Sequence, residues 1–264
     1  MAASALRTAG LGLLLWAAVA CSNQQELAPA QLDYGYGFFP LDIGRSWTYT
    51  VDSVVFVSQG NGVVRDSSFT FAKETLVDTF RAADGTLFYR GERFERKNPS
   101  EPWAFSGVFA LARTDRQAIR LENNLQIVLL PFPNGWGATF EPWIYFGHDR
   151  LVSVGGESIM MYKDWLLSVV DDQASYPLGD SLLQPVRRLE NIQYESKNNW
   201  REAYFSFAEG VGLVTQQLFI LDTNCDLDGS GSLDTPDEIN CEALPPEDQA
   251  VKGFILQQRL IDYQ

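Results

Sequence analysis

Apolar and polar residues alternate along much of the chain after residue 38. In residues 46–57 the larger apolar side chains fall on one face of an extended chain: Trp47, Tyr49, Val51, Val55 and Val57. Similar stretches recur between turn sequences rich in Gly, Asn, Asp and Pro, at residues 67–80, 86–97, 103–113, 117–130, 156–162, 184–195, 203–207, 213–221 and 253–263. The one helix candidate is residues 164–172. The pattern predicts an all-β domain, either an antiparallel sandwich or a curved barrel-like sheet.

The composition limits the classes of partner. The chain has 264 residues, with 20 Lys and Arg against 34 Asp and Glu and a net charge of −14. Apolar residues make up 45% of it, which is enough for one sizeable core. Nucleic-acid binding needs clustered Lys and Arg that contact phosphates, and the sequence has no such cluster. We therefore expect no nucleic-acid partner.

The first residues have the composition of a secretory leader. Arg7 is the only charge before residue 26, and residues 11–20 form an apolar run too short to span a bilayer. The run ends in Ala18-Val19-Ala20-Cys21, which resembles the lipobox of bacterial lipoproteins. The resemblance implies that residues 1–20 are removed and that Cys21 is lipidated and holds the chain at the membrane. Ala18 stands where that family prefers Leu, and ordinary signal-peptidase cleavage also fits the sequence.

The segment after Cys21 separates this anchor from the domain. Residues 21–37 are polar and lack periodicity, which is typical of a tether, and the β domain is expected over residues 38–264. The F-P-L-x-x-G-x-x-W-x-Y sequence of residues 39–49 and the A-x-G-V-G-L-V sequence of residues 208–214 resemble β-rich envelope lipoproteins, mostly of the Bacteroidota. The resemblance implies an outer-membrane lipoprotein on the periplasmic or surface face.

An acidic segment near the C-terminus carries the clearest chemical motif. Between Arg201 and Lys252 there are eleven acidic residues and no basic one. Residues 226–237 resemble the twelve-residue EF-hand loop, whose alternate positions supply oxygen ligands to Ca²⁺ and whose sixth position, here Gly231, makes a sharp turn. Matched by position, the resemblance implies as ligands Asp226, Asp228, Ser230, Ser232 through its backbone carbonyl, Asp234 and Asp237.

The flanks of this loop depart from the paired EF-hand family. Residues 213–221 alternate like a strand, whereas Pro236 and Glu238 favour a short helix over residues 236–243. We therefore predict a strand-loop-helix calcium-loop insert over residues 222–248. Asp237 stands where the family has Glu, which weakens the expected affinity. The alternative is an acidic hairpin tip that binds no ion.

The three cysteines fit the same interpretation. An odd number in a secreted chain leaves one thiol to explain, and lipidation of Cys21 accounts for it. Cys225 and Cys241 then remain as a pair on the two sides of the loop. A disulfide across their sixteen-residue separation is expected to contribute about 3 kcal/mol.

The main functional hypothesis is a non-enzymatic, lipid-anchored envelope protein with one Ca²⁺ site and a structural or interaction role. Its partners would be the membrane and a protein or glycan. One alternative is a surface carbohydrate-binding protein that uses exposed tryptophans among Trp103, Trp136, Trp143, Trp165 and Trp200. A glycan hydrolase with paired carboxylates and a lipid carrier with a hollow apolar interior are the others. The lone His148 is expected in a loop rather than at a catalytic site.

Overall fold

The computed structural model describes residues 33–264 except 61, 192–197, 226–240 and 242. All described elements belong to one compact unit, Tyr34–Gln264. The all-β prediction is confirmed by the strands β1 (Ser46–Gln59), β2 (Gly62–Arg81), β3 (Leu87–Arg96), β4 (Ala104–Arg113), β5 (Gln117–Glu122), β6 (Leu125–Pro131), β7 (Thr139–Phe140), β8 (Leu151–Val154), β9 (Glu157–Met160), β10 (Leu167–Leu178), β11 (Ser181–Asn191), β12 (Asn199–Ala208), β13 (Gly212–Thr223) and β14 (Ala250–Tyr263), with the short helices η1 (Tyr36–Phe38) and α3 (Pro246–Gln249).

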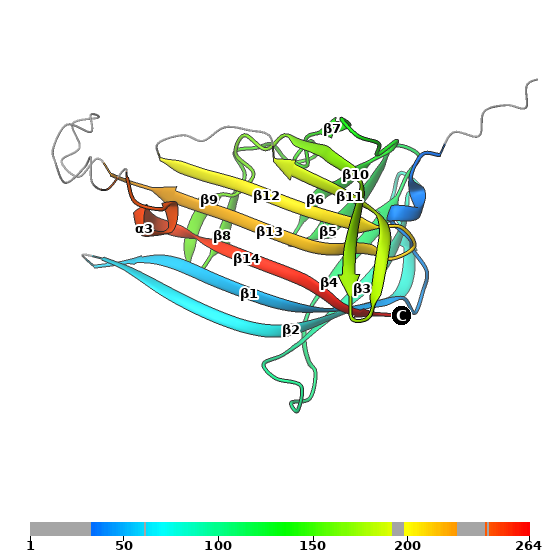
Figure 1. Cartoon of the computed structure of the whole chain (residues 1–264), viewed down its shortest axis with the longest axis horizontal. Helices are drawn as coiled ribbons and strands as arrows, with labels where there is room; N and C mark the ends of the chain where they lie inside the picture. The colour runs from blue at the N-terminus through cyan, green and yellow to red at the C-terminus, as the bar shows by residue number, and fades with distance from the viewer. Residues whose placement is uncertain (1–32, 61, 192–197, 226–240, 242) are drawn as a thin grey trace, which may run out of the picture. The chain divides into compact units, whose positions relative to one another are not determined.

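Twelve of the strands form one antiparallel sheet. Their order is β6-β5-β4-β3-β2-β1-β14-β13-β12-β11-β10-β7, and β8 pairs with β9 in a separate hairpin. Each of the two meanders, β1–β6 and β10–β14, follows the order of the chain. They join where β1 pairs with β14, as at Trp47 opposite Tyr263. The first and last long strands therefore hold the two halves of the sheet together (Figure 1).

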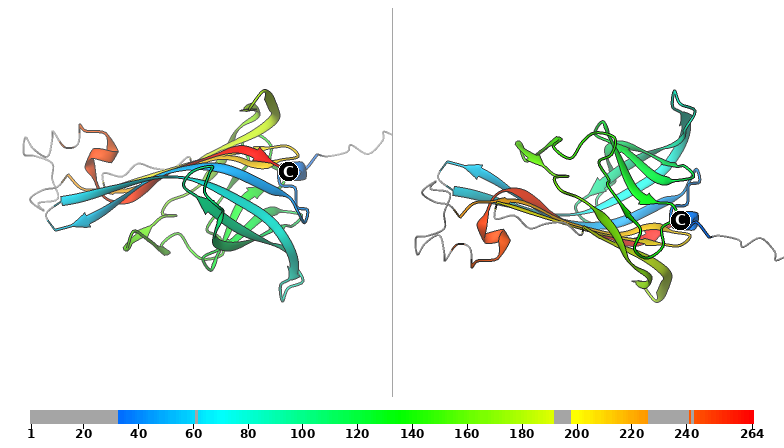
Figure 2. Two further views of the ribbon diagram at one scale, coloured as in Figure 1. Left: turned by 90° about the horizontal axis from the view of Figure 1, so that it is seen from below. Right: turned by 90° about the horizontal axis from the view of Figure 1, so that it is seen from above.

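The sheet curls until its two outer strands approach each other. Beyond β7, the carbonyl of Pro142 accepts a hydrogen bond of 3.0 Å from the Val128 amide in β6. Of the two predicted alternatives, a sandwich and a curved barrel-like sheet, the structure has the barrel-like form. At one end β1, β2, β13 and β14 continue past the curled part as a twisted ribbon (Figures 1 and 2).

Alternation along β1 sets the inner face, as predicted. Trp47, Tyr49 and Val51 are buried in the main core. Toward the end of the strand Phe56 is buried instead, in a separate cluster with Leu221 and Ala250. Period two places Phe56 on the opposite face from Val51, so near the ribbon end the sheet buries apolar side chains on its outer face as well.

The chain enters the domain at the end remote from the ribbon (Figure 1). Tyr36 and Phe38 belong to η1, and Phe38 is fully buried with the Arg187 guanidinium 4.3 Å from the centre of its ring. Arg113 holds the same segment by donating hydrogen bonds to the carbonyls of Tyr36 and Phe39. The last residues of the predicted tether are thus packed against the strands.

Two predicted elements differ from the structure. The helix expected over residues 164–172 is wrong, because β10 begins at Leu167 and pairs with β11 and β7. Asp164 has a φ of 58°, which is left-handed and cannot continue a helix. The single stretch 117–130 is two strands, because Asn123 and Asn124 both have positive φ and form a tight turn. The loop of the predicted insert and its exit helix, apart from Cys241 and Ala243, lie in the part that the structure does not describe.

Candidate functional site

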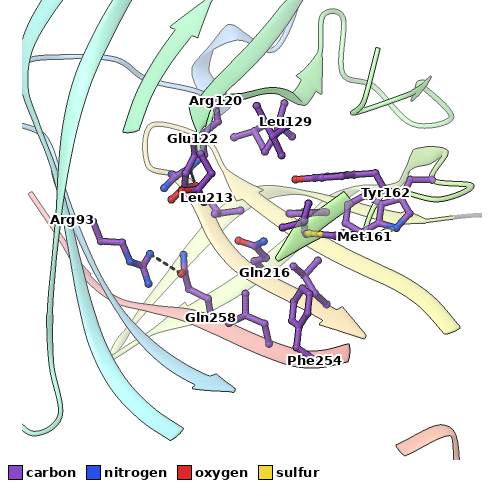
Figure 3. A pocket seen from close by; sticks show the side chains of 18 of the residues that line it. Arg93, Arg120, Glu122, Leu129, Met161, Tyr162, Leu213, Gln216, Phe254 and Gln258 are labelled. Atoms are coloured by element: carbon purple, nitrogen blue, oxygen red, sulfur yellow. Dashed lines mark hydrogen bonds and ion pairs between the residues drawn. The ribbon is translucent and has the colours of Figure 1, made fainter. Parts of the chain in front are cut away.

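The inner face of the curled sheet lines a cavity of about 310 Å³ (Figure 3). Alternate residues of single strands supply its wall, because alternate side chains of a strand point to one face. Leu125, Ile127 and Leu129 come from β6 in this way. Phe254, Leu256 and Gln258 come from β14, on the other meander. The cavity therefore exists only when the two halves of the sheet curl together.

The hairpin β8–β9 and the residues that follow it complete the apolar wall. Val152, Met161 and Trp165 line the cavity from this segment. A Cβ atom added at Gly155, in the hairpin turn, would lie 2.8 Å from a methyl group of Val55 and 2.9 Å from one of Val57. Only glycine permits this close approach, which holds the hairpin against the inner face of β1.

One end of the cavity is a buried cluster of charges. Glu74, which is 3% exposed, accepts hydrogen bonds from Arg120 at 2.7 and 3.0 Å and from Arg93 at 3.0 Å. Arg120 also donates to Glu122 at 2.7 Å. The paired geometry of Arg120 on Glu74 is the strongest arrangement available to these groups. Figure 3 shows Arg93 across the cavity from Met161 and Tyr162.

These contacts shift the ionisation of the cluster. Burial raises the pKa of Glu74, but the charges and hydrogen bonds of Arg120 and Arg93 outweigh it and hold the pKa at about 2. Burial lowers the pKa of Arg120, and the Glu74 carboxylate more than reverses this, so that the pKa is raised. All three groups are charged at neutral pH. The cavity thus has fixed charges at one end that already satisfy one another.

Several polar groups that line the cavity have no protein partner within the described residues. Trp165 is 2% exposed, and its indole N–H has none. Burial, followed by the negative charge of Glu122, raises the pKa of Tyr162, so its hydroxyl carries a proton at neutral pH. No hydrogen bond from the Tyr162 hydroxyl or the Gln216 amide to a described residue is present, and Gln258 uses its carbonyl alone, to accept from Arg93. The indole of Trp165 can only donate, whereas the Tyr162 hydroxyl and the Gln216 amide can both donate and accept.

The base of the predicted insert is well connected to the sheet. Cys225 and Cys241 form a disulfide with a Cα–Cα distance of 5.5 Å, which is the predicted pairing. Arg65 in β2 donates hydrogen bonds of 2.7 Å to the Asp248 side chain and the Glu247 carbonyl at α3. The two ends of the insert are therefore held beside each other and against the ribbon.

The predicted metal and lipid sites lie outside the described residues. This applies to Cys21 and to the six calcium ligands Asp226, Asp228, Ser230, Ser232, Asp234 and Asp237. In the part of the chain that the structure describes, no group of three or more His, Cys, Asp and Glu is placed to hold a metal ion. Both sites remain predictions from the sequence.

The tryptophans do not gather into one exposed platform. Trp136 is 75% exposed, whereas Trp165 is buried and Trp103, Trp143 and Trp200 are partly buried. The indole N–H of Trp143 donates 2.9 Å to the carbonyl of Trp165, which ties it to the cavity wall. These positions favour structural roles for most of the rings.

The cavity residues are not among the sites predicted from the sequence, although a signal for them exists. In β14 the inward positions read Phe254, Leu256, Gln258 and Leu260, so a polar residue interrupts an apolar alternation. Glu74 likewise stands between buried Ala72 and Leu76 in β2. Such interruptions mark polar groups that face a core, but the strands that bring them together are not evident from one strand alone.

Comparisons with known proteins add little. No protein-family model and no curated protein matches the chain. Among solved structures it is similar to a candidate lipoprotein from Parabacteroides distasonis, with 9% identity, a TM-score of 0.38, and coverage of 86% of this chain and 98% of that one. A likeness at this level carries no weight for function. No helix among the described residues is long and apolar enough to cross a membrane.

Proposed function

We propose that this chain is a lipid-anchored envelope protein whose curled sheet binds a small, largely apolar molecule in its interior. The observation that carries the proposal is the cavity of about 310 Å³, with apolar walls and a self-satisfied charge cluster at one end. Cavities of this size and character are typical of binding sites for small molecules. The role is binding rather than catalysis.

The volume sets the size of the ligand. At about 30 Å³ for each water-sized group, a cavity of about 310 Å³ holds roughly ten non-hydrogen atoms. The part of a ligand inside the cavity is thus smaller than a membrane phospholipid. A compact aromatic or a medium-length alkyl chain fits this limit.

A titration with naphthylamine, an uncharged fluorescent amine of this size, tests the proposal. The full chain carrying Cys21→Ser has no site for lipidation. We expect saturable binding of one probe per chain with a blue shift and increased emission, because the probe leaves water for an apolar wall. Emission that rises without saturation would contradict a defined interior site.

The Ca²⁺ site is a second proposal, for the insert. The Cys225–Cys241 disulfide and the contacts of Arg65 support it, because they bring together the two ends of the acidic loop. The site would have a structural role, with the low affinity typical of extracellular modules. Calorimetric titration with Ca²⁺ should show one saturable site that is lost in Asp226→Ala. Unchanged heats in that variant would remove the proposal.

The membrane anchor is the third part of the account. Its support is the apolar leader that ends in Ala18-Val19-Ala20-Cys21. We assign the protein to the cell envelope on this basis, and an oxidised Cys225–Cys241 pair agrees with such a compartment.

A further inference from the structure

The cavity has more hydrogen-bonding capacity than the surrounding protein uses. Trp165 and Gln258 are 2% and 5% exposed, and the Trp165 indole N–H has no partner among the described residues. The side-chain NH₂ of Gln258 also makes no hydrogen bond to a described residue. The only hydrogen bond of this side chain in the described part is the one that its carbonyl oxygen accepts from Arg93. A buried donor that stays unpaired costs free energy, so native proteins rarely leave one without an acceptor.

A third donor comes from the opposite side of the cavity. Tyr162 is 4% exposed and lines the cavity, and Figure 3 shows it across from Arg93 and Gln258. Its hydroxyl makes no hydrogen bond to any residue that the structure describes. Of the three, the Tyr162 hydroxyl and the Gln258 side-chain NH₂ lie on two sides of the same space, and neither has an acceptor among the residues that the structure describes.

The charges of the wall argue against a charged ligand. Two carboxylates, Glu74 and Glu122, and two guanidinium groups, Arg93 and Arg120, line the cavity, so their formal charges cancel. Each guanidinium already donates to carboxylate oxygens at 2.7–3.0 Å. A ligand carboxylate would lose its hydration and would have to displace one of these partners. An ammonium group would lie beside the same two arginines.

We propose that the cavity selects an uncharged, mainly apolar molecule that carries an oxygen able to accept hydrogen bonds, such as a ketone, ester or ether. The inference rests on the proposed function and specifies its ligand class. The apolar body would contact Met161, Leu256 and Phe254, and the oxygen would accept from Tyr162 or Gln258.

Displacement of naphthylamine by three related compounds tests the selectivity. Butylbenzene has no acceptor, butyrophenone adds a carbonyl, and phenylbutyrate adds a carboxylate. On the chain carrying Cys21→Ser at pH 7, we expect butyrophenone to bind at least about tenfold more tightly than either of the others, since one buried hydrogen bond is worth about that factor.

Two tyrosine variants test which side chain donates to the carbonyl oxygen of the ligand. Tyr162→Phe removes one donor while keeping the ring, and should weaken butyrophenone about tenfold while leaving butylbenzene unchanged. The matched control is Tyr204→Phe, since the Tyr204 hydroxyl donates to Glu202 and that residue does not line the cavity. It should leave both compounds unaffected.

The possible failures are distinguishable. Equal binding of butyrophenone and butylbenzene would overturn the inference, because water alone would then satisfy the donors, but the binding function would stand. Tighter binding of phenylbutyrate would overturn it in favour of an anionic ligand. If naphthylamine itself does not bind, both the inference and the proposed function fail.

Discussion

At the scale of single residues, Glu74 is the centre of a buried ion cluster. Its carboxylate is buried and accepts three hydrogen bonds from Arg93 and Arg120. These residues come from β2, β3 and β5, so the ion cluster joins strands that are not all neighbours. Removal of one partner from such a cluster leaves buried charge without compensation.

We therefore expect Glu74→Gln to lower the free energy of unfolding by about 3–5 kcal/mol at pH 7. The control is Glu92→Gln, because Glu92 and its partner Arg90 keep 28% and 41% of their side chains exposed, and loss of this partly exposed pair should cost about 1 kcal/mol or less. Urea unfolding followed by tryptophan fluorescence measures both. Equal effects of the two substitutions would contradict the assigned role.

The same residue predicts a pH dependence. The pKa of Glu74 is about 2 in the folded chain, against 4.5 for an unperturbed glutamate. Because the folded value is the lower one, its contribution is complete above pH 4.5 and is lost as pH falls toward 2. The difference in unfolding free energy between the native chain and Glu74→Gln should narrow over that range. A difference in unfolding free energy that stays constant between pH 5 and pH 2.5 would contradict the lowered pKa of Glu74.

At the scale of elements, β14 depends on a glycine that brings strands together. Gly253 has a φ of 134°, and a Cβ atom there would collide with the backbone of Ile220 and Leu221 in β13. Gly107 in β4 has no atom within 4 Å of such a Cβ. A side chain is therefore excluded at Gly253 and has room at Gly107, although both glycines lie within strands.

Gly253→Ala should accordingly destabilise the fold by about 2 kcal/mol or more, through strain and the displaced backbone. Gly107→Ala should leave stability within about 1 kcal/mol of the native value. Thermal unfolding of the two variants side by side gives the comparison. Similar midpoints would show that β13 and β14 can separate at this point without cost.

The strands also differ in how well the sequence predicts them. Regular alternation made β1 and β14 predictable, because their inward positions follow period two. In β10 the pairing with β11 shifts register between Val169 and Asp171, between Asp171 and Ala174, and again by Tyr176. These irregularities break the alternation and explain why residues 164–172 looked helical. The pairing of Cys225 with Cys241 was predictable because only two cysteines remained.

At the scale of the whole domain, the sheet curls until its edge strands approach each other around an interior cavity. Curling of the first meander brings Arg120 to Glu74, and the pairing of β1 with β14 adds Gln258 from the other half of the sheet. That closure is a property of the complete set of strands, so no single stretch predicts the cavity. The base of the insert, at α3, is held by Arg65 at the ribbon end, remote from η1, where the chain enters the domain (Figure 1).

The central claim is that the interior of this sheet is a binding site, and a filled cavity tests it most directly. Leu256→Trp places a larger ring into the cavity, whereas Val108→Trp adds the same ring at a position of β4 that is 56% exposed. In the naphthylamine titration we predict that Leu256→Trp abolishes saturable binding and Val108→Trp leaves it unchanged, with circular dichroism confirming that both variants are folded. Unaltered binding in a folded Leu256→Trp chain would contradict the account, because the probe would then bind elsewhere.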